Sequence, residues 1–210
     1  MTRDTLLRWA ENVPPYPVEI GRWLTLGWHV LAADLFGWIL LTIVYGAVQI
    51  VASSTGIGVL LILGPLEVGL YAVVLSRLRK GTLDIGELGR GFSRFIPGFL
   101  AGCFVGVLAT VGLAFLIFPG LVVLALYLFT FALISDFDID FWTALEVSRK
   151  VVARRWLDWT LFVLVQTMML LIGTAFCGVG LLLAFPWIKI STAVAYEEIF
   201  APVLAQQGVG

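Results

Sequence analysis

Charged side chains are scarce in this chain. It has 13 Lys and Arg residues and 14 Asp and Glu residues among 210, or 13% charged, whereas a soluble domain carries about 25%. The chain therefore lacks the charge needed to cover a surface that faces water. Its net charge of −1 provides no overall field that would attract nucleic acid.

Histidine and cysteine are also nearly absent, with one His and two Cys. A single histidine excludes a site built on two histidine ligands, and Cys103 and Cys177 do not have metal-ligand spacing. We interpret the two cysteines as small apolar side chains that form no disulfide. No metal and no cofactor is expected.

Sequence motifs of catalysis are missing as well. No serine lies in a G-x-S-x-G turn, and the sequence has neither a Walker loop nor a dinucleotide-binding fingerprint. A Ser-His-Asp triad would have to use His29, which we interpret instead as a polar residue at the level of the lipid headgroups. These absences predict that the protein is not an enzyme.

Long apolar runs take the place of charge. Hydrophobic residues make up 60% of the chain, and the mean hydropathy is +1.03. No charged residue occurs from Leu35 to Leu66, from Phe95 to Ser135, or from Trp159 to Ile188. Because one membrane crossing needs about 20 apolar residues, each run is long enough to form a helical hairpin.

The sequence therefore predicts an all-α membrane protein with six transmembrane helices, at about 35–51, 57–78, 96–118, 121–135, 157–172 and 179–200. The dipeptide Pro119-Gly120 is predicted to break the chain between the third and fourth helices. The corresponding division of the chain is an N-terminal segment 1–19, a transmembrane domain 20–200 and a C-terminal tail 201–210.

Basic residues gather at alternate ends of the apolar runs, and the turns 52–58, 118–120 and 173–180 contain none. Cytoplasmic loops of membrane proteins hold the excess of Lys and Arg. We therefore expect both termini and both basic loops to be cytoplasmic, in a multi-pass protein of the cell inner (plasma) membrane.

The three predicted hairpins have the character of repeats. Each follows a segment that mixes basic and aromatic residues, at Ile20–Asp34, Leu83–Phe95 and Phe141–Trp156. Such an amphipathic segment is expected to lie in the cytoplasmic interface of the membrane. Because two crossings return the chain to its starting side, the three units are predicted to be parallel.

The third of these segments is predicted to contact anionic headgroups of the inner leaflet. The residues expected to make this contact are Trp142, Arg149, Lys150, Arg154, Arg155 and Trp156. An aromatic belt at the cytoplasmic interface is also expected. Its predicted members are Trp23, Trp28, Trp38, Trp142, Trp156 and Trp159.

Three groups of glycines, prolines and aromatic residues carry a family resemblance. They are Gly64-Pro65-Leu66…Gly69-Leu70-Tyr71 with Gly91-Phe92…Phe95, then Phe141-Trp142…Leu145…Trp156, and then Cys177-Gly178-Val179-Gly180…Pro186…Tyr196…Phe200. Over about Ile20–Phe200 the chain resembles a broad bacterial superfamily of six-helix integral membrane proteins of unknown function. That superfamily includes the membrane domain fused to some glycerophosphodiester phosphodiesterases. The resemblance implies a fold and a bacterial inner membrane, and it carries over no catalytic residue.

Two ionisable residues are predicted at membrane depth, where a charge is costly and marks a candidate functional site. Glu67 and Lys189 each lie about ten residues, or about 15 Å, from the outer end of a predicted helix. Opposite charges at equal depth predict an ion pair across the bundle. The pair could fix the fold or serve as a relay for protons or substrate, and Lys189 could instead extend toward the headgroups.

Prolines and glycines mark further positions inside the predicted helices. Pro65 and Pro186 remove backbone hydrogen bonds and are candidates for helix breaks, which line substrate sites in transporters, or for simple kinks. Gly98, Gly102 and Gly106 form a face on which a second helix can pack closely. This contact could be internal or between copies of the chain.

The acidic residues Asp136, Asp138 and Asp140 lack the spacing of a calcium-binding loop. We interpret them as capping residues at the start of the helix that follows.

Three functional classes remain possible from these patterns. Short outer turns and few buried charges favour a non-catalytic scaffold or accessory subunit of a membrane complex, which would have a protein partner. The alternative is a transporter or channel for a small or lipidic solute, with Glu67, Lys189 and the two prolines at its core. An enzyme that acts on lipid is the least favoured class.

Overall fold

The structure is a computed structural model that describes residues 3–115, 117–175 and 178–205, and these residues contain helices and no strand. Five helical stretches are long and apolar enough to cross a membrane. They are Leu35–Ser53, Gly58–Lys80, Phe95–Gly112, Ile117–Phe137 and Trp156–Ala175. The prediction of an all-helical fold with several helices long and apolar enough to cross a membrane is thus confirmed.

The helices follow one another in a simple order. They are α1 (Arg3–Glu11), α2 (Ile20–Ala33), α3 (Leu35–Ser53), α4 (Gly58–Lys80), the short 3₁₀ helix η1 (Ile85–Gly89), α5 (Arg90–Ser93), α6 (Phe95–Phe115), α7 (Ile117–Leu126), α8 (Thr130–Phe137), α9 (Phe141–Ala153), α10 (Trp156–Ala175) and α11 (Leu181–Ala205). The last helix is not among the five apolar stretches, and it carries Lys189, Glu197 and Glu198. A sixth crossing therefore stays a prediction.

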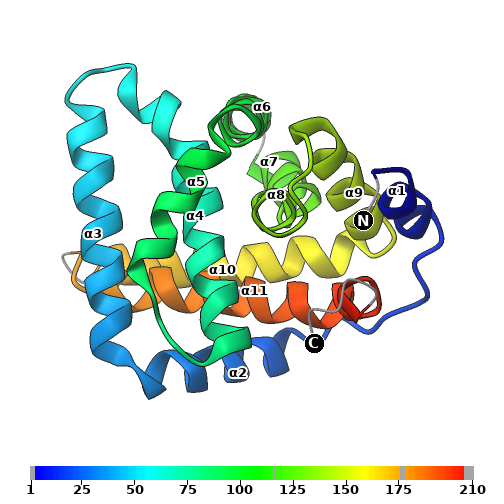
Figure 1. Cartoon of the computed structure of the whole chain (residues 1–210), viewed down its shortest axis with the longest axis horizontal. Helices are drawn as coiled ribbons and strands as arrows, with labels where there is room; N and C mark the ends of the chain where they lie inside the picture. The colour runs from blue at the N-terminus through cyan, green and yellow to red at the C-terminus, as the bar shows by residue number, and fades with distance from the viewer. Residues whose placement is uncertain (1–2, 116, 176–177, 206–210) are drawn as a thin grey trace.

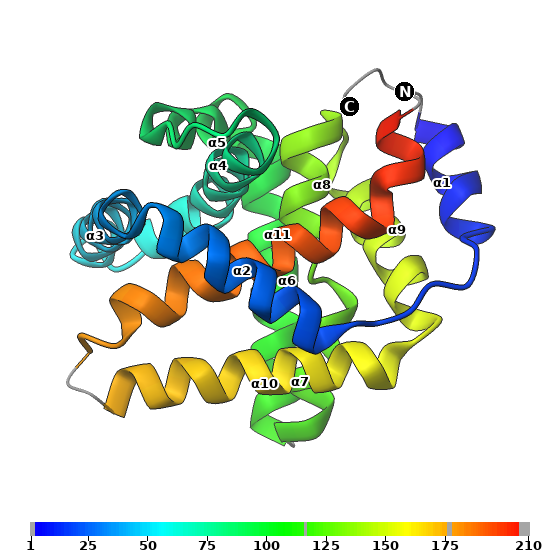
Figure 2. The same ribbon diagram turned by 90° about the horizontal axis from the view of Figure 1, so that it is seen from below.

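The long helices run in three directions. In Figure 1, α3 and α4 are upright, α10 and α11 lie across the view, and α6 is seen end-on. In Figure 2, α3 is seen end-on instead. Helices that are neighbours in sequence also pack together, as α3 with α4, α6 with α7, and α10 with α11. Because these pairs cross one another, the parallel hairpin repeat expected from the sequence stays a prediction.

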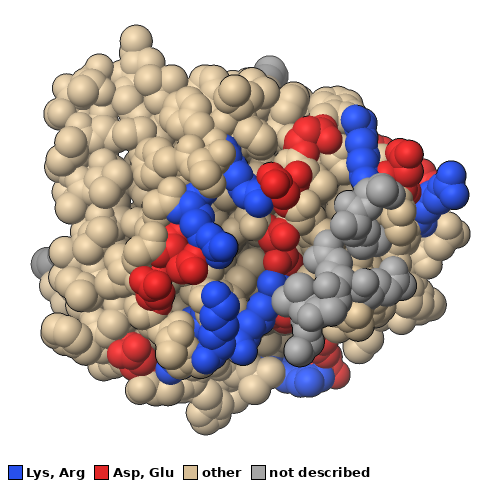
Figure 3. Space-filling view, in the orientation of Figure 1, with Lys and Arg blue, Asp and Glu red and all other residues tan. Residues whose placement is uncertain are grey.

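Charge is distributed unevenly over the surface. On the face seen in Figure 3, acidic and basic side chains gather toward the centre and the right, whereas the upper left, over α3 and the start of α4, shows none. This asymmetry accords with a chain that keeps its charges out of hydrocarbon.

The break predicted at Pro119-Gly120 is wrong. Both residues lie inside α7, with Pro119 in its first turn, where the N–H that proline lacks has no helical partner. Helix α6 ends at Phe115 and α7 begins at Ile117, and residue 116 lies outside the described residues.

The amphipathic segments pack against protein. In α9, Ala144, Val147 and Val151 are fully buried, and the helix contacts α1, α6, α7 and α8. Likewise α2 lies along α11, where Gly27 meets Ser191. The protein itself therefore covers much of the apolar face of α9, and a position of this helix in the membrane interface stays a prediction.

Half of the tryptophans predicted to form a belt at the membrane interface lie in the protein core instead. Trp23, Trp38 and Trp159 are fully buried, and the rings of Trp23 and Trp159 stack with their centroids 5.2 Å apart. Their indole N–H groups have acceptors: Trp23 donates to Glu198 Oε2 at 2.8 Å. Trp28, Trp142 and Trp156 are exposed and remain available to an interface.

Backbones approach closely between α4 and α6. A Cβ atom added at Gly64 would lie 1.9 Å from the carbonyl oxygen of Gly98, and one added at Gly102 would lie 2.9 Å from Gly64 Cα. Of the three glycines predicted to pack closely, Gly98 and Gly102 therefore do so, within the chain. Gly106 does not, because a Cβ there would meet nothing within 4 Å.

Candidate functional site

The structure brings Glu67 of α4 and Lys189 of α11 together. Lys189 Nζ lies 2.6 Å from Glu67 Oε2, and the two side chains are only 11% (Glu67) and 19% (Lys189) exposed. Such a pair is stable only where the geometry is good and further hydrogen bonds satisfy the remaining atoms.

Both members of the pair have additional partners. The hydroxyl of Tyr45 donates to Glu67 Oε1 at 2.8 Å, and Gln49 Nε2 donates in turn to the Tyr45 hydroxyl at 3.3 Å. Lys189 Nζ lies 5.5 Å from the ring centroids of both Tyr71 and Phe185, within range of a cation–π interaction. The pair is therefore held from α3, α4 and α11.

Neither predicted helix break occurs at its proline. Pro65 lies inside α4 and Pro186 inside α11, and both helices continue through them. Each proline still leaves one carbonyl without its helical donor, four residues earlier. Each proline thus lies shortly before one member of the ion pair, in a helix that stays continuous. Pro65 and Pro186 therefore provide no irregular backbone at the site.

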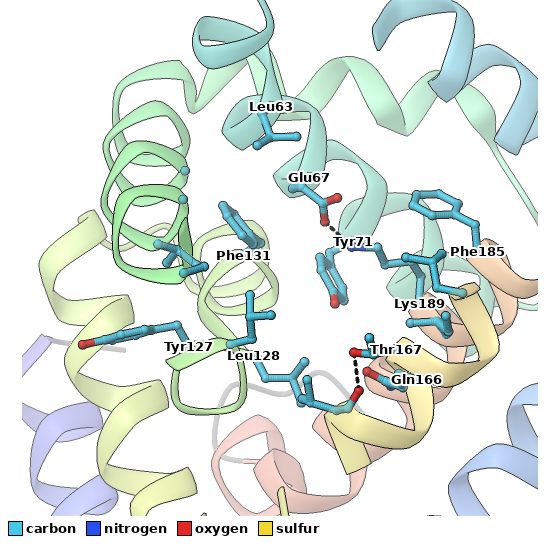
Figure 4. A pocket seen from close by; sticks show the side chains of 18 residues that line it. Leu63, Glu67, Tyr71, Tyr127, Leu128, Phe131, Gln166, Thr167, Phe185 and Lys189 are labelled. Carbon is cyan, nitrogen blue, oxygen red and sulfur yellow. Dashed lines mark hydrogen bonds and ion pairs between the residues drawn. The ribbon is translucent and has the colours of Figure 1, made fainter. Parts of the chain in front are cut away.

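A cavity of about 370 Å³ lies beside the ion pair. Figure 4 shows Glu67 and Lys189 on one side of it, with Phe131, Leu128 and Tyr127 on the other. Its remaining wall is mostly apolar. The lining residues from α6, α10 and α11 include Gly102, Val105, Gly106, Val163, Leu170, Phe185 and Ile188, with Gln166 and Thr167 as polar members.

One membrane-length helix is interrupted at this cavity. The 21-residue apolar stretch Ile117–Phe137 divides into α7 and α8 at a turn over residues 127–129, which contains no proline or glycine. Tyr127 and Leu128 of this turn line the cavity. The irregular backbone that the sequence placed at two prolines is therefore here.

Ser148 of α9 completes the turn. Its hydroxyl donates to the carbonyl oxygen of Leu126 at 2.8 Å and accepts from the N–H of Phe129 at 3.2 Å. A side chain that inserts into the ladder of helical hydrogen bonds is a recognised cause of a break. Sequence reasoning missed Ser148, whose only signal is a polar residue on the apolar face of its helix.

A second, partly buried ionic cluster joins α4, α8 and α11. Arg79 makes two hydrogen bonds to Asp136, at 2.6 and 2.8 Å, and one to Glu197 at 2.7 Å. The Tyr196 hydroxyl also donates to Asp136, at 2.9 Å. Asp136 is therefore the centre of a cluster and not the capping residue that its neighbours in sequence suggested.

The other two aspartates behave differently from each other. Asp138 pairs with Arg94, whereas Asp140 caps α9 and accepts hydrogen bonds from the N–H and the hydroxyl of Thr143. Burial acts to raise the pKa of Asp140, but the hydrogen bonds from Thr143 together with the charge of Arg3 leave that pKa below its usual value. The capping interpretation thus holds in the structure for Asp140.

The basic residues predicted to contact lipid already have acceptors within the chain. Arg149 bonds to Glu146 at 3.1 Å, Lys150 pairs with Glu11 at 2.8 Å, and Arg154 bonds to the carbonyl oxygen of Glu11. Arg155 likewise pairs with Asp158 at 2.8 Å, while Trp142 and Trp156 are exposed. Contact of these six residues with lipid stays a prediction.

Of the two cysteines, the structure describes only Cys103. Cys103 is a free, half-buried residue of α6, and Cys177 lies outside the described residues. Their interpretation as unlinked apolar side chains stays a prediction.

Comparison of the chain with protein-family models, with curated proteins and with solved structures found no match. The site must therefore be interpreted from its own geometry.

Proposed function

We propose that this multi-pass membrane protein binds a small, largely apolar solute in the cavity beside Glu67 and Lys189, as a transporter or carrier of that solute. The observation that supports this proposal most is the turn over residues 127–129, which interrupts an apolar stretch opposite the ion pair. The proposal includes α11 as a sixth crossing, a plasma-membrane location and cytoplasmic termini.

Irregular backbone at membrane depth supports a binding role. In hydrocarbon, an unsatisfied N–H or C=O group costs several kcal/mol, so non-helical backbone occurs there only when buried in protein or lining a cavity. Broken helices of this kind form the substrate sites of many transporters. Here the turn is both stabilised by Ser148 and placed at a cavity wall.

The chemistry of the cavity sets the kind of solute. Ligand sites are about 300–1,000 Å³ in volume, mostly apolar, with a few polar groups that fix orientation. The cavity meets this description, with Gln166, Thr167 and the ion pair as its polar groups. Because Glu67 and Lys189 neutralise each other, the part of a solute inside the cavity should carry no net charge.

Filling the cavity tests the proposal. Gly106 lines it, and a Cβ there meets nothing within 4 Å, so Gly106→Leu should fold and occupy part of the space. Small molecules that co-purify with the wild-type protein, identified by mass spectrometry after extraction, should fall about tenfold in the variant. Gly46→Leu is the matched control, because Gly46 in α3 has equal space around it and does not line the cavity.

Equal amounts of bound molecules in wild type, Gly106→Leu and Gly46→Leu would refute the binding role. Retention of a specific protein partner by all three chains would then favour the scaffold or accessory subunit that the sequence suggested first.

A further inference from the structure

A second hollow, of about 250 Å³, opens between α6 and α9 at the α7–α8 turn. We call it the α6–α9 groove, and it is lined by Phe104, Tyr127, Trp142, Leu145, Glu146 and Arg149. Three of these side chains are aromatic, and the two charged ones lie on α9. The groove therefore combines an apolar floor with a charged edge.

Tyr127 lines both the α6–α9 groove and the cavity beside Glu67 and Lys189, which we call the central cavity. Its ring packs edge-on against Phe104, with the centroids 5.8 Å apart, and Phe104 packs edge-on against the exposed Trp142 at 6.1 Å. Figure 4 shows the Tyr127 hydroxyl pointing away from Glu67 and Lys189. The two hollows are thus adjacent and meet at the Tyr127 side chain.

The two charged residues that line the groove, Glu146 and Arg149, pair with each other. Glu146 lies 3.1 Å from Arg149 and 3.2 Å from Lys150, and Lys150 also pairs with Glu11. The Arg149 side chain is 47% exposed, so its guanidinium can take a further acceptor.

We propose that the α6–α9 groove admits one acyl chain of an anionic lipid, which passes Tyr127 and ends in the central cavity while its phosphate binds Arg149. This inference rests on the proposed function, because it assigns an occupant to the same cavity. A hydrocarbon chain suits two narrow apolar spaces placed end to end, and guanidinium binds phosphate through short, charge-assisted hydrogen bonds. Trp142 is exposed and lines the same groove, and tryptophan is enriched where membrane proteins meet the headgroup layer.

The experiment uses the full chain, purified in detergent, and two photoreactive lipids. Lysophosphatidylglycerol and lysophosphatidylcholine would each carry a diazirine at the end of the single acyl chain, and crosslinked residues would be mapped by mass spectrometry. The anionic lipid should label the cavity residues Leu124, Phe131 and Leu170 about tenfold more than the zwitterionic one, the effect of about one charge-assisted contact.

Two variants separate the headgroup from the chain. Arg149→Gln should abolish the tenfold preference, whereas Arg90→Gln, an exposed arginine outside the groove, should retain it. Gly106→Leu should move the labels out of the cavity to the groove residues Trp142 and Leu145 while the anionic preference remains. A diacyl phosphatidylglycerol that competes with the probe would identify the membrane as the source, and competition by free fatty acid alone would identify a soluble one.

The inference and the proposed function can fail separately. Equal labelling by both lipids, unaffected by Arg149→Gln, would overturn the anionic site even if Gly106→Leu still displaced co-purified molecules. Labels confined to the outer surface of the helices in the wild type would overturn the route past Tyr127.

Discussion

Replacing Lys189 by methionine will lower the free energy of unfolding by about 3–5 kcal/mol, because it leaves the buried carboxylate of Glu67 without its cation. Tyr45 alone would then hold that carboxylate. Glu67→Gln should be costly for the same reason, since it leaves a buried ammonium ion. Denaturant unfolding of the purified chain in detergent measures both effects, and Lys80→Met, at the exposed end of α4, is the control.

The double variant Glu67→Gln with Lys189→Met should be more stable than either single variant. Both charges are then removed together, and a buried pair replaced by neutral groups is often stabilising or neutral. Additive losses in the double variant would show that the two residues do not depend on each other, which contradicts the 2.6 Å contact.

Gly64→Ala will lower the free energy of unfolding by about 3 kcal/mol, at the upper end of the usual effect of overpacking. Its methyl group would lie 1.9 Å from the carbonyl oxygen of Gly98, so α4 and α6 must separate. A rigid backbone atom cannot move aside as a flexible side chain can. The separation would also disturb the cavity wall, because Gly102 lines the cavity and contacts Gly64.

Gly106→Ala is the matched control on the same pair of helices. It has no close neighbour, and alanine is favoured over glycine in a helix by about 1 kcal/mol, so this variant should be unchanged or slightly more stable. Thermal unfolding of the two variants under identical conditions compares them. A Gly64→Ala variant as stable as Gly106→Ala would show that α4 and α6 do not meet at Gly64.

The ion pair shows which features the sequence could predict. Glu67 and Lys189 were identifiable because a charge inside an apolar run is rare, and equal depth with opposite sign suggests a contact. The structure places them 2.6 Å apart. A pattern of this kind depends only on composition and on the rise of a helix, so it can be recognised without knowing the tertiary packing.

The helix break shows what the sequence could not predict. Because proline lacks a backbone N–H, the sequence predicted breaks at Pro65, Pro186 and Pro119. None of these residues breaks its helix. At the actual break the turn is held by hydrogen bonds from Ser148, which is distant in sequence and reaches the turn only through tertiary packing. A break imposed from outside a helix leaves no signal in the residues of that helix.

The amphipathic helix α9 is an intermediate case. Its two-faced pattern was visible, but the pattern does not say whether lipid or protein covers the apolar face. Val147 and Val151 are fully buried by the chain itself. Asp136 was misinterpreted for a similar reason, because its partner Arg79 lies on another helix.

Thiol labelling at position 106 tests the cavity most directly. In a chain with Cys103 and Cys177 replaced by serine, Gly106→Cys would be treated with N-ethylmaleimide in detergent, beside Ala132→Cys at a fully buried position outside the cavity. An accessible solute site predicts that position 106 reacts and position 132 does not, and that the bound solute slows the reaction. Equal protection of both positions after removal of bound lipid would contradict the existence of such a site.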